Sequence, residues 1–291
     1  MIETYKQRYT LLAMHEKYIF WNVLFFGISV LITRLGKLFI TNITFFKDYF
    51  FLSNSFTELI FKPWTIFTYA FLHGGFWHLI SNMIGLYFFG RIFSTFYNSR
   101  QFQNFYWVSA IVAGLTFMLA YVIFPIFKGS SIPLVGASGA VFAILFAATA
   151  KSPNYVLNLF GVLRLKLWVL SAIYTVFFLF SLDSNNAGGQ FAHLGGALFG
   201  YIASKQLDKG NNICRWFELI VDYFNGLFTK KGKMKVVHKT NTKHKRTYTN
   251  QEAKAVEKQK KLDAILDKIS KSGYNSLTKA ERDFLTKTSE E

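Results

Sequence analysis

The stretch Leu134-Val-Gly-Ala-Ser-Gly-Ala-Val-Phe-Ala-Ile-Leu145 decides which fold the sequence indicates. Ser138 brings one hydroxyl group to a run of small residues, and the apolar sequence that follows contains no charge before Lys151. A helix that crosses the hydrocarbon core of a bilayer needs about 20 apolar residues, and this run is shorter. The sequence therefore places a reactive side chain at the start of an apolar helix that is too short to span.

Charge is unevenly distributed along the 291 residues. The sequence is 52% hydrophobic and 19% aromatic, yet its formal net charge is +17. Of the 33 lysines and arginines, 20 lie from Lys205 onward, and the acids between Lys17 and Lys205 are Asp48, Glu58 and Asp183. An apolar first two thirds and a basic last third predict a membrane domain followed by a polar tail. The single cysteine of the chain excludes an internal disulfide framework.

Six apolar stretches are candidates for membrane-spanning helices. In chain order they are Tyr18–Leu35, Phe76–Tyr97, Phe102–Phe124, Ala137–Ala150, Leu165–Leu182 and Phe191–Ser204. The fourth and the sixth are short, at 14 residues each. The aromatic-rich segment 41–73 predicts an interfacial loop with short amphipathic helices. We therefore predict an all-α membrane protein, in which a bundle of six transmembrane helices precedes a short helical cytoplasmic tail.

Cations in the loops predict how this bundle is oriented. Five lie in the loops after the second and fourth spans or within a few residues of the adjoining span ends, namely Arg91, Arg100, Lys151, Arg164 and Lys166. The opposite loop at 125–136 has one cation, although the long first loop has four and is the exception. The positive-inside rule then places both termini in the cytoplasm. We expect a multi-pass protein of the inner (cytoplasmic) membrane.

Four parts follow from these patterns. We predict a cytoplasmic N-terminus at 1–17, a six-helix membrane domain at 18–204, an amphipathic surface helix with a basic linker at 205–250, and a small helical cytoplasmic module at 251–291. The surface helix is expected within Asn211–Phe228. In the last part, Gly273 is a plausible end for one helix, and Thr278 with Glu281 has the spacing of a capping box for a second.

Three of the predicted spans carry polar side chains that lipid disfavours. They are His78 and Asn82 on the second span, Ser138 on the fourth and His193 on the sixth. His78, Ser138 and His193 precede the next cation on the cytoplasmic side by 13, 13 and 12 residues, or about 18–20 Å of helix. All three therefore lie at one depth, roughly 10 Å below the outer surface of a core about 30 Å thick. Ionisable groups inside a membrane indicate function by default.

Spacing within the spans brings these groups together. The polar pair of the second span is four residues apart and shares one face of the helix. On the sixth span His193, Gly196 and Gly200 share a face, where small residues let another helix approach closely. The fourth span begins with equally small residues, so we expect the fourth and sixth to pack with Ser138 against His193.

A serine at a helix start, beside water and near a histidine, is poised as a nucleophile with its base. The short fourth helix requires irregular backbone to enter the membrane before it, which is tolerated beside a water-filled cavity or inside protein. Free backbone N–H groups at the helix start can face a developing oxyanion, with His78 and Asn82 as further donors. No acidic residue is expected at this depth, so the predicted chemistry uses a Ser–His dyad.

These residues resemble the rhomboid family of intramembrane serine proteases. Three motifs carry the resemblance, which covers about Tyr18–Ser204: Gly136-Ala-Ser138-Gly139, the sixth-span pattern Ala192-His193-x-x-Gly196-x-x-x-Gly200, and His78-Leu-Ile-Ser-Asn82 preceded by His73. Gly-x-Ser-Gly alone is a weak signal, whereas the three motifs in this order are specific. The segment from Gln251 also resembles a small helical module appended to rhomboid-type proteins in some bacteria.

The resemblance implies a role for each residue. Ser138 is the nucleophile and His193 the general base, and His78, Asn82 and the Ser138 N–H form the oxyanion hole. Helix packing at the site is assigned to Gly136, Gly139, Gly196, Gly200 and Phe142, and a structural role to His73. Phe142 replaces a tyrosine found in some members, which keeps the stacking on the histidine but loses the hydroxyl. The family also implies a substrate gate at 183–190 and the fifth helix.

The predicted activity is cleavage of transmembrane segments in single-span membrane proteins, with small residues at the cleaved position. The alternative is an inactive rhomboid-like protein that binds membrane clients, but such proteins lose the serine or the histidine. A zinc site formed by His73, His78 and His193 lacks the glutamate of a zincin motif, so we expect no metal and no cofactor. The basic tail favours the lipid bilayer over nucleic acid as its partner, and no protein partner of the tail is predicted.

Overall fold

The chain divides into two compact units, Met1–Lys231 and Gly232–Glu291. A computed structural model describes residues 2–39, 44–159, 163–182, 186–228 and 250–289 of them. The first unit contains every apolar stretch considered above, and the second contains the helical C-terminal module. The basic linker predicted at 230–246 lies outside the described residues.

The helices of the first unit confirm an all-α membrane bundle. Among the described residues, α2 (Met14–Gly36), α6 (Phe76–Phe96) and α7 (Ser99–Ile123) are long and apolar enough to cross a membrane. Two further apolar helices, α8 (Ser138–Lys151) and α9 (Leu167–Phe180), are shorter. The number of six spans stays a prediction.

The sixth predicted span is longer than its apolar pattern. Instead of 14 residues, α10 (Ala187–Asp208) has 22. The helix begins with Ala-Gly-Gly-Gln and ends with Lys-Gln-Leu-Asp, and these terminal turns are helical without being apolar. A hydrophobicity pattern detects only the apolar part of a helix, so it predicted a length for α10 that is too short.

The N-terminal segment is also helical. α1 (Ile2–Leu11) precedes α2, and the side chain of Glu16 accepts a hydrogen bond of 2.7 Å from the Ala13 N–H at the start of α2. The first span thus begins four residues before the predicted Tyr18. Its buried residues are His15, Tyr18 and Asn22, while most of the helix faces outward.

Short helices occupy the segment between α2 and α6, as predicted for 41–73, of which residues 41–43 lie outside the described part. They are α3 (Phe45–Phe50), α4 (Phe56–Phe61), α5 (Thr65–Thr68) and the 3₁₀ turn η1 (Tyr69–Phe71). Backbone bonds of 2.8 and 3.1 Å between Leu52 and Leu134 tie this segment to the approach to α8. The irregular backbone before α8 is therefore paired inside protein, where it is tolerated at membrane depth.

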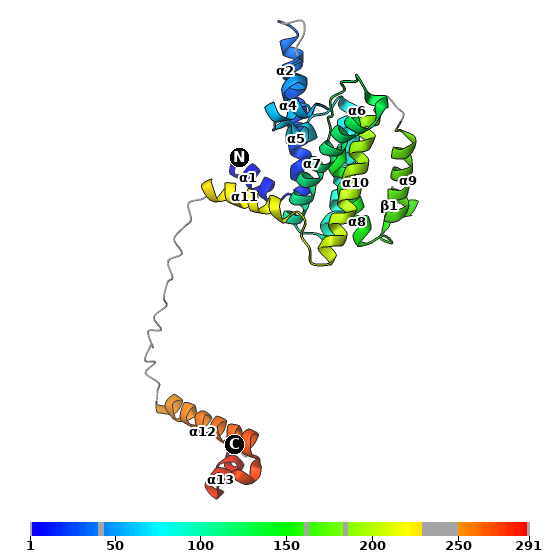
Figure 1. Cartoon of the computed structure of the whole chain (residues 1–291). Helices are drawn as coiled ribbons and strands as arrows, with labels where there is room; N and C mark the ends of the chain where they lie inside the picture. Colours follow the sequence, from blue (N-terminus) through cyan, green and yellow to red (C-terminus); the bar gives the residue numbers. More distant parts are fainter. Residues whose placement is uncertain (1, 40–43, 160–162, 183–185, 229–249, 290–291) are drawn as a thin grey trace. The chain divides into compact units, whose positions relative to one another are not determined.

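Helix α8 is the centre of the bundle (Figure 1). It packs against α6, α7, α9 and α10, and five of its side chains are fully buried, namely Ala143, Ile144, Leu145, Ala147 and Ala148. A Cβ atom at Gly196 or Gly200 of α10 would lie 2.2 or 2.1 Å from a carbonyl oxygen of α8. The predicted close packing of these two helices is thereby confirmed.

Gly139 contributes to a different helix contact. A Cβ atom at this position would lie 2.5 Å from the Cβ of Ala113 on α7. Its carbonyl oxygen, by contrast, faces Gly196 of α10. The small residues at the start of α8 therefore let both α7 and α10 pack closely against it.

A β-hairpin, which the sequence analysis missed, connects α8 to α9. Strand β1 (Val156–Leu159) pairs with β2 (Leu163–Lys166) in an antiparallel register with Val156 opposite Lys166. As a consequence α9 begins at Leu167 instead of Leu165. Strand β2 alternates apolar and polar residues over four positions and β1 does not, a signal that is too short to be separated from a loop.

Helix α11 (Arg215–Phe228) has the predicted amphipathic character. Cys214 and Phe217 are buried against Val108 of α7, and burial raises the pKa of the Cys214 thiol to about 12. An ion pair joins Arg100 of α7 to Asp222. Large apolar side chains on another face are exposed: Trp216, Leu219, Ile220, Tyr223, Phe224 and Leu227.

The second unit forms two helices, α12 (Asn250–Ser272) and α13 (Lys279–Ser289), around a 3₁₀ turn η3 (Tyr274–Ser276). Gly273 ends α12 with a φ of +75°, a conformation that favours glycine. Glu281 accepts hydrogen bonds from Lys268 and from the Thr278 N–H, and these bonds lower the pKa of Glu281 to about 2. The predicted helix end and capping box are both confirmed.

Candidate active site

Ser138 is the first residue of α8, and the segment before it sets its position. Gly136 has a φ of +118°, and its N–H donates a 2.9 Å bond to the carbonyl of Tyr69. The hydroxyl of Tyr69 in turn donates to the carbonyl of Ala110 on α7. Gly136 is therefore needed for a turn that favours glycine, in addition to the packing role predicted for it.

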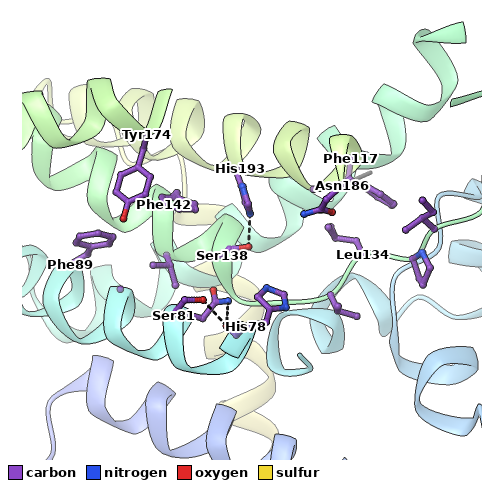
Figure 2. Close-up of a pocket in the computed structure, with 18 of the residues that line it drawn as sticks. His78, Ser81, Phe89, Phe117, Leu134, Ser138, Phe142, Tyr174, Asn186 and His193 are labelled. Carbon is purple, nitrogen blue, oxygen red and sulfur yellow. Dashed lines mark hydrogen bonds between the residues drawn. The ribbon is translucent and has the colours of Figure 1, made fainter. Parts of the chain in front are cut away.

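The hydroxyl of Ser138 lies 2.7 Å from Nε2 of His193 (Figure 2). The histidine is on the second turn of α10, and the packing of α10 on α8 brings the two side chains together. Both residues are half-buried. The predicted pair therefore has the geometry of a nucleophile hydrogen-bonded to its base.

A third side chain completes this line of contacts, and the sequence analysis did not predict it. Oε1 of Gln190 lies 3.2 Å from Nδ1 of His193 on the other side of the imidazole ring. Gln190 is buried, with 6% of its surface exposed. The prediction of a Ser–His dyad allowed only an acid as a third residue. The residue in this place is a neutral amide, three residues before His193 on the same helix face.

Two phenylalanine rings flank His193. The centroids of Phe142 on α8 and of Phe178 on α9 each lie 5.0 Å from that of the imidazole. Phe142 meets the imidazole at an interplanar angle of 63°, so the contact is edge-to-face instead of the predicted stacking. Phe178 was not predicted, because it lies on another span, among other phenylalanines, and no sequence motif distinguishes it.

His78 and Asn82 lie on one face of α6, as predicted, and line the cavity beside Ser138. The Asn82 amide donates a 2.8 Å bond to the backbone carbonyl of His78, within its own helix. The imidazole of His78 packs over Gly136, where a Cβ atom would lie 2.8 Å from the ring. In this structure, therefore, one N–H of the Asn82 side-chain amide donates to a backbone acceptor.

His73 is buried behind His78, and the centroids of the two rings are 5.2 Å apart. Within the described residues, neither ring nitrogen of His73 has a hydrogen-bond partner. No cluster of three or more His, Cys, Asp or Glu side chains able to hold a metal occurs in the described part of the chain. The proposed structural role of His73 rests on its burial beside His78.

A cavity of about 500 Å³ contains this site. Polar groups from three helices line one part of it, namely His78, Ser81 and Asn82 of α6, Ser138 of α8 and His193 of α10 (Figure 2). Another part is aromatic, with Phe89, Phe117, Tyr121, Phe142 and Tyr174. Of the predicted gate at 183–190, residues 183–185 lie outside the described part, and 187–190 form the first turn of α10.

The arrangement provides three elements of acyl-transfer chemistry. The hydroxyl of Ser138 has a base in contact. At the start of α8, the first backbone hydrogen bond runs from the N–H of Val141 to the carbonyl of Ala137. The N–H groups that precede Val141 at the helix start therefore lack intrahelical acceptors. A negative charge that develops beside Ser138 would lie at the positive end of this helix.

Comparisons with known proteins agree with this geometry. The Rhomboid domain family matches residues 61–207, and a family of unknown function (DUF6576) matches residues 249–291. The chain is 36% identical over 154 residues to "Rhomboid protein 1, mitochondrial" of Saccharomyces cerevisiae, covering 48% of this chain and 42% of that protein. It is 31% identical over 163 residues to "RHOMBOID-like protein 12, mitochondrial" of Arabidopsis thaliana, covering 50% and 47%.

The chain thus spans about half the length of the curated relatives that it matches. The match to the Rhomboid domain covers half of the chain and includes α6 to α10, the helices that surround the cavity. On this evidence the chain belongs to the rhomboid family of intramembrane proteins.

Proposed function

We propose that the protein is an intramembrane serine endopeptidase that cleaves transmembrane segments of single-span membrane proteins. The observation that carries the proposal is the 2.7 Å contact between Ser138 Oγ and His193 Nε2 inside a cavity of the membrane bundle. A serine that served only helix packing would not need a buried imidazole within hydrogen-bond distance on another helix.

The first chemical step is attack of Ser138 Oγ on the carbonyl carbon of the scissile peptide bond. The hydroxyl proton moves to Nε2 of His193, and the carbonyl electron pair moves to its oxygen. The free N–H groups at the start of α8 stabilise this oxyanion. His78 and Asn82 act as further donors. One N–H of the Asn82 amide donates to the carbonyl of His78, and its second N–H remains for the oxyanion.

The intermediate then collapses, and the peptide C–N bond breaks. His193 gives its proton to the departing amine, which leaves the other half of the substrate as an ester on Ser138. A water molecule attacks the ester carbonyl carbon, and its proton passes to His193. The C–O bond to Ser138 then breaks, and the proton returns from His193 to Ser138 Oγ. A second hydrolysis product with a free carboxyl group is released.

The substrate class follows from the location of the cavity in the membrane unit. A peptide bond inside a helix has its carbonyl hydrogen-bonded four residues on, so the segment must unwind before Oγ can reach it. The polar part of the cavity offers hydrogen-bonding groups to the unwound backbone. The cytoplasmic placement of both termini rests on the loop cations alone. The inner-membrane location stays a prediction, and the two curated relatives are named as mitochondrial proteins.

The experiment is cleavage of a single-span reporter in liposomes, combined with labelling of Ser138 by a fluorophosphonate. Ser138→Ala and His193→Ala are compared with Ser94→Ala, a matched control because Ser94 lies on α6 outside the cavity lining and donates to the carbonyl of Gly90 in its own helix. We expect both dyad variants to lose at least about 10³-fold in rate, and the control to retain the activity of the wild type.

Cleavage that survives Ser138→Ala would overturn the mechanism. Labelling of Ser138 without cleavage would retain the active serine and reject the reporter as a substrate. Neither labelling nor cleavage by the folded wild type would overturn the protease proposal in favour of a protein that binds membrane clients.

A further inference from the structure

The contact between Gln190 and His193 has a chemical direction that the rest of the site determines. Nε2 of His193 must be free of hydrogen to accept the proton of Ser138 Oγ, which lies 2.7 Å away. A neutral imidazole carries its single hydrogen on the other nitrogen. That hydrogen is on Nδ1, where the group within hydrogen-bond distance is Gln190 Oε1 at 3.2 Å.

An N–H group in this position needs an acceptor, because its neighbour Gln190 is buried and is not among the residues that line the cavity. Gln190 itself is 6% exposed, so water does not replace it easily. The two residues are three positions apart on α10, and a side chain at this spacing reaches its partner from a rigid backbone. The contact therefore fixes both the rotation of the ring and the nitrogen that carries the hydrogen.

We propose that Gln190 is a positioning residue for His193, and that it supplies through a neutral amide the orientation that an acid supplies in a Ser–His–Asp triad. The inference rests on the protease function proposed above. An acid in a triad holds the correct tautomer and also stabilises the imidazolium that forms. Gln190 performs the first task fully and the second only through the dipole of its carbonyl group.

A neutral partner suits the surroundings of this histidine. The titratable groups that line the same cavity are His78 on α6, Tyr121 on α7 and Tyr174 on α9, and among the described lining residues none carries a permanent charge. A buried carboxylate would need compensation by charge or several hydrogen bonds. An amide needs only hydrogen-bond partners, so it orients His193 at a smaller desolvation cost.

The experiment measures the rate of Ser138 labelling by a fluorophosphonate against pH, in the full-length protein. Gln190→Met keeps the length and volume of the side chain but removes the acceptor, and Gln190→Glu keeps an acceptor. Gln103→Met on α7, which lines a separate cleft, is the matched control for the amide-to-thioether change. All variants are compared at equal yield of folded protein.

We expect Gln190→Met to be labelled at least about tenfold more slowly, equivalent to a loss of about 1.4 kcal/mol. We expect Gln190→Glu to retain labelling and to move the acidic limb of the rate profile to higher pH, because a carboxylate favours the imidazolium that cannot act as a base. A role in packing alone would leave the profile of Gln190→Glu unchanged. Equal rates and profiles for the wild type and Gln190→Met would overturn the proposal.

A second measurement separates this inference from the protease function. Nitrogen-15 NMR of His193 reports which ring nitrogen carries the hydrogen, whether or not the protein cleaves anything. We expect hydrogen on Nδ1 in the wild type and a mixture of tautomers in Gln190→Met. Hydrogen on Nε2 in the wild type would overturn the proposed contact, whereas absent labelling of the wild type with hydrogen on Nδ1 would overturn the protease function alone.

Discussion

Helices α8 and α9 have the same length and opposite surroundings. Each has 14 residues and both are apolar, yet ten residues of α8 are buried against three of α9. Side-chain size accounts for the difference, because α8 is rich in alanine whereas α9 is rich in phenylalanine and leucine. In a bilayer lipid covers apolar surface as well as protein does, so small residues decide which helix others can approach.

The comparison extends to the candidate site. Ser138 belongs to the helix that four others surround, whereas α9 contributes the ring of Phe178 to His193 and leaves most of its surface outside. Ser138 is thus held by the helix with the larger share of buried residues. The helix that contributes Phe178 to His193 is held by few buried residues, which is where local opening costs least.

The largest effect is expected where α10 meets the backbone of α8. Gly200→Val places carbon atoms where a single Cβ would already lie 2.1 Å from the carbonyl oxygen of Ala143. Overpacking costs about 1–3 kcal/mol when side chains can move, and occasionally more, and here the obstacle is backbone. We expect loss of folded protein, measured as yield of monodisperse protein in detergent.

The matched control for that change is Gly27→Val on α2, where nothing lies within 4 Å of the added Cβ. We expect it to be folded with a stability close to that of the wild type. If both variants were tolerated, close helix approach would not be what places α8 in the centre.

The second prediction compares one isoleucine on each short helix. Ile144 of α8 is fully buried and Ile173 of α9 is 54% exposed. Ile144→Ala should lower the free energy of unfolding by about 2–5 kcal/mol through the cavity it leaves. Ile173→Ala should change it by within about 0.5 kcal/mol, as expected of a surface position.

Unfolding in mixed detergent micelles measures both isoleucine variants under one condition. Equal losses would mean that α9 is packed as tightly as α8, either in the bundle or against another copy of the chain. The contrast between the two helices would then not describe the protein in its membrane.

The third prediction concerns the contact that α9 makes with the site. Phe178→Leu removes the ring beside His193 but conserves most of the volume, so its cost in stability should be below about 1.5 kcal/mol. An aromatic contact contributes about 0.5–1.5 kcal/mol, so Ser138 labelling should slow by about two- to tenfold. Phe177→Leu is the control, since Phe177 is 58% exposed.

If Phe177→Leu slowed labelling as much as Phe178→Leu, the effect would come from α9 as a whole rather than from the contact with the imidazole. A normal rate for Phe178→Leu would show that Phe142 and Gln190 hold His193 without help from α9.

The smallest effect is expected at the far ends of α8 and α10, where Lys151 and Asp208 form an ion pair. Both side chains are partly exposed, so Lys151→Gln should cost less than about 1 kcal/mol, with the difference shrinking at high salt. Lys209→Gln serves as the control for removal of a nearby charge. A loss above that of Ile144→Ala would mean that the pair is a main support of α8.

Much of the fold was predictable because its signals are local. Apolar runs located the helices, and the spacing of His193, Gly196 and Gly200 predicted which helices pack. The capping pair Thr278 and Glu281 was equally visible. The polar ends of α10 and the four-residue strands were not predicted, since neither short strands nor polar helical turns produce an apolar pattern of sufficient length.

The candidate site was predictable to the extent that its chemistry uses reactive side chains. Ser138 and His193 were expected at one depth, and the structure brings them together. Gln190 and Phe178 were missed because an amide and a phenylalanine occur in many roles, and only the three-dimensional arrangement selects them. The turn at Gly136 was not predicted, because a sequence gives no backbone angle.

The ion pair of Lys151 with Asp208 also marks the far ends of two helices whose relative angle the candidate site restricts. It joins the last residue of α8 to the last residue of α10, whereas Ser138 and His193 lie toward the other ends of these helices. The ion pair and Ser138 are separated by the length of α8, which is 14 residues or about 20 Å. Reacting groups must be held to about 0.5 Å, which over that length corresponds to a relative tilt of only about 1.5°. Bilayers of different thickness change helix tilt, so this protein should sense membrane thickness through its rate well before its fold responds.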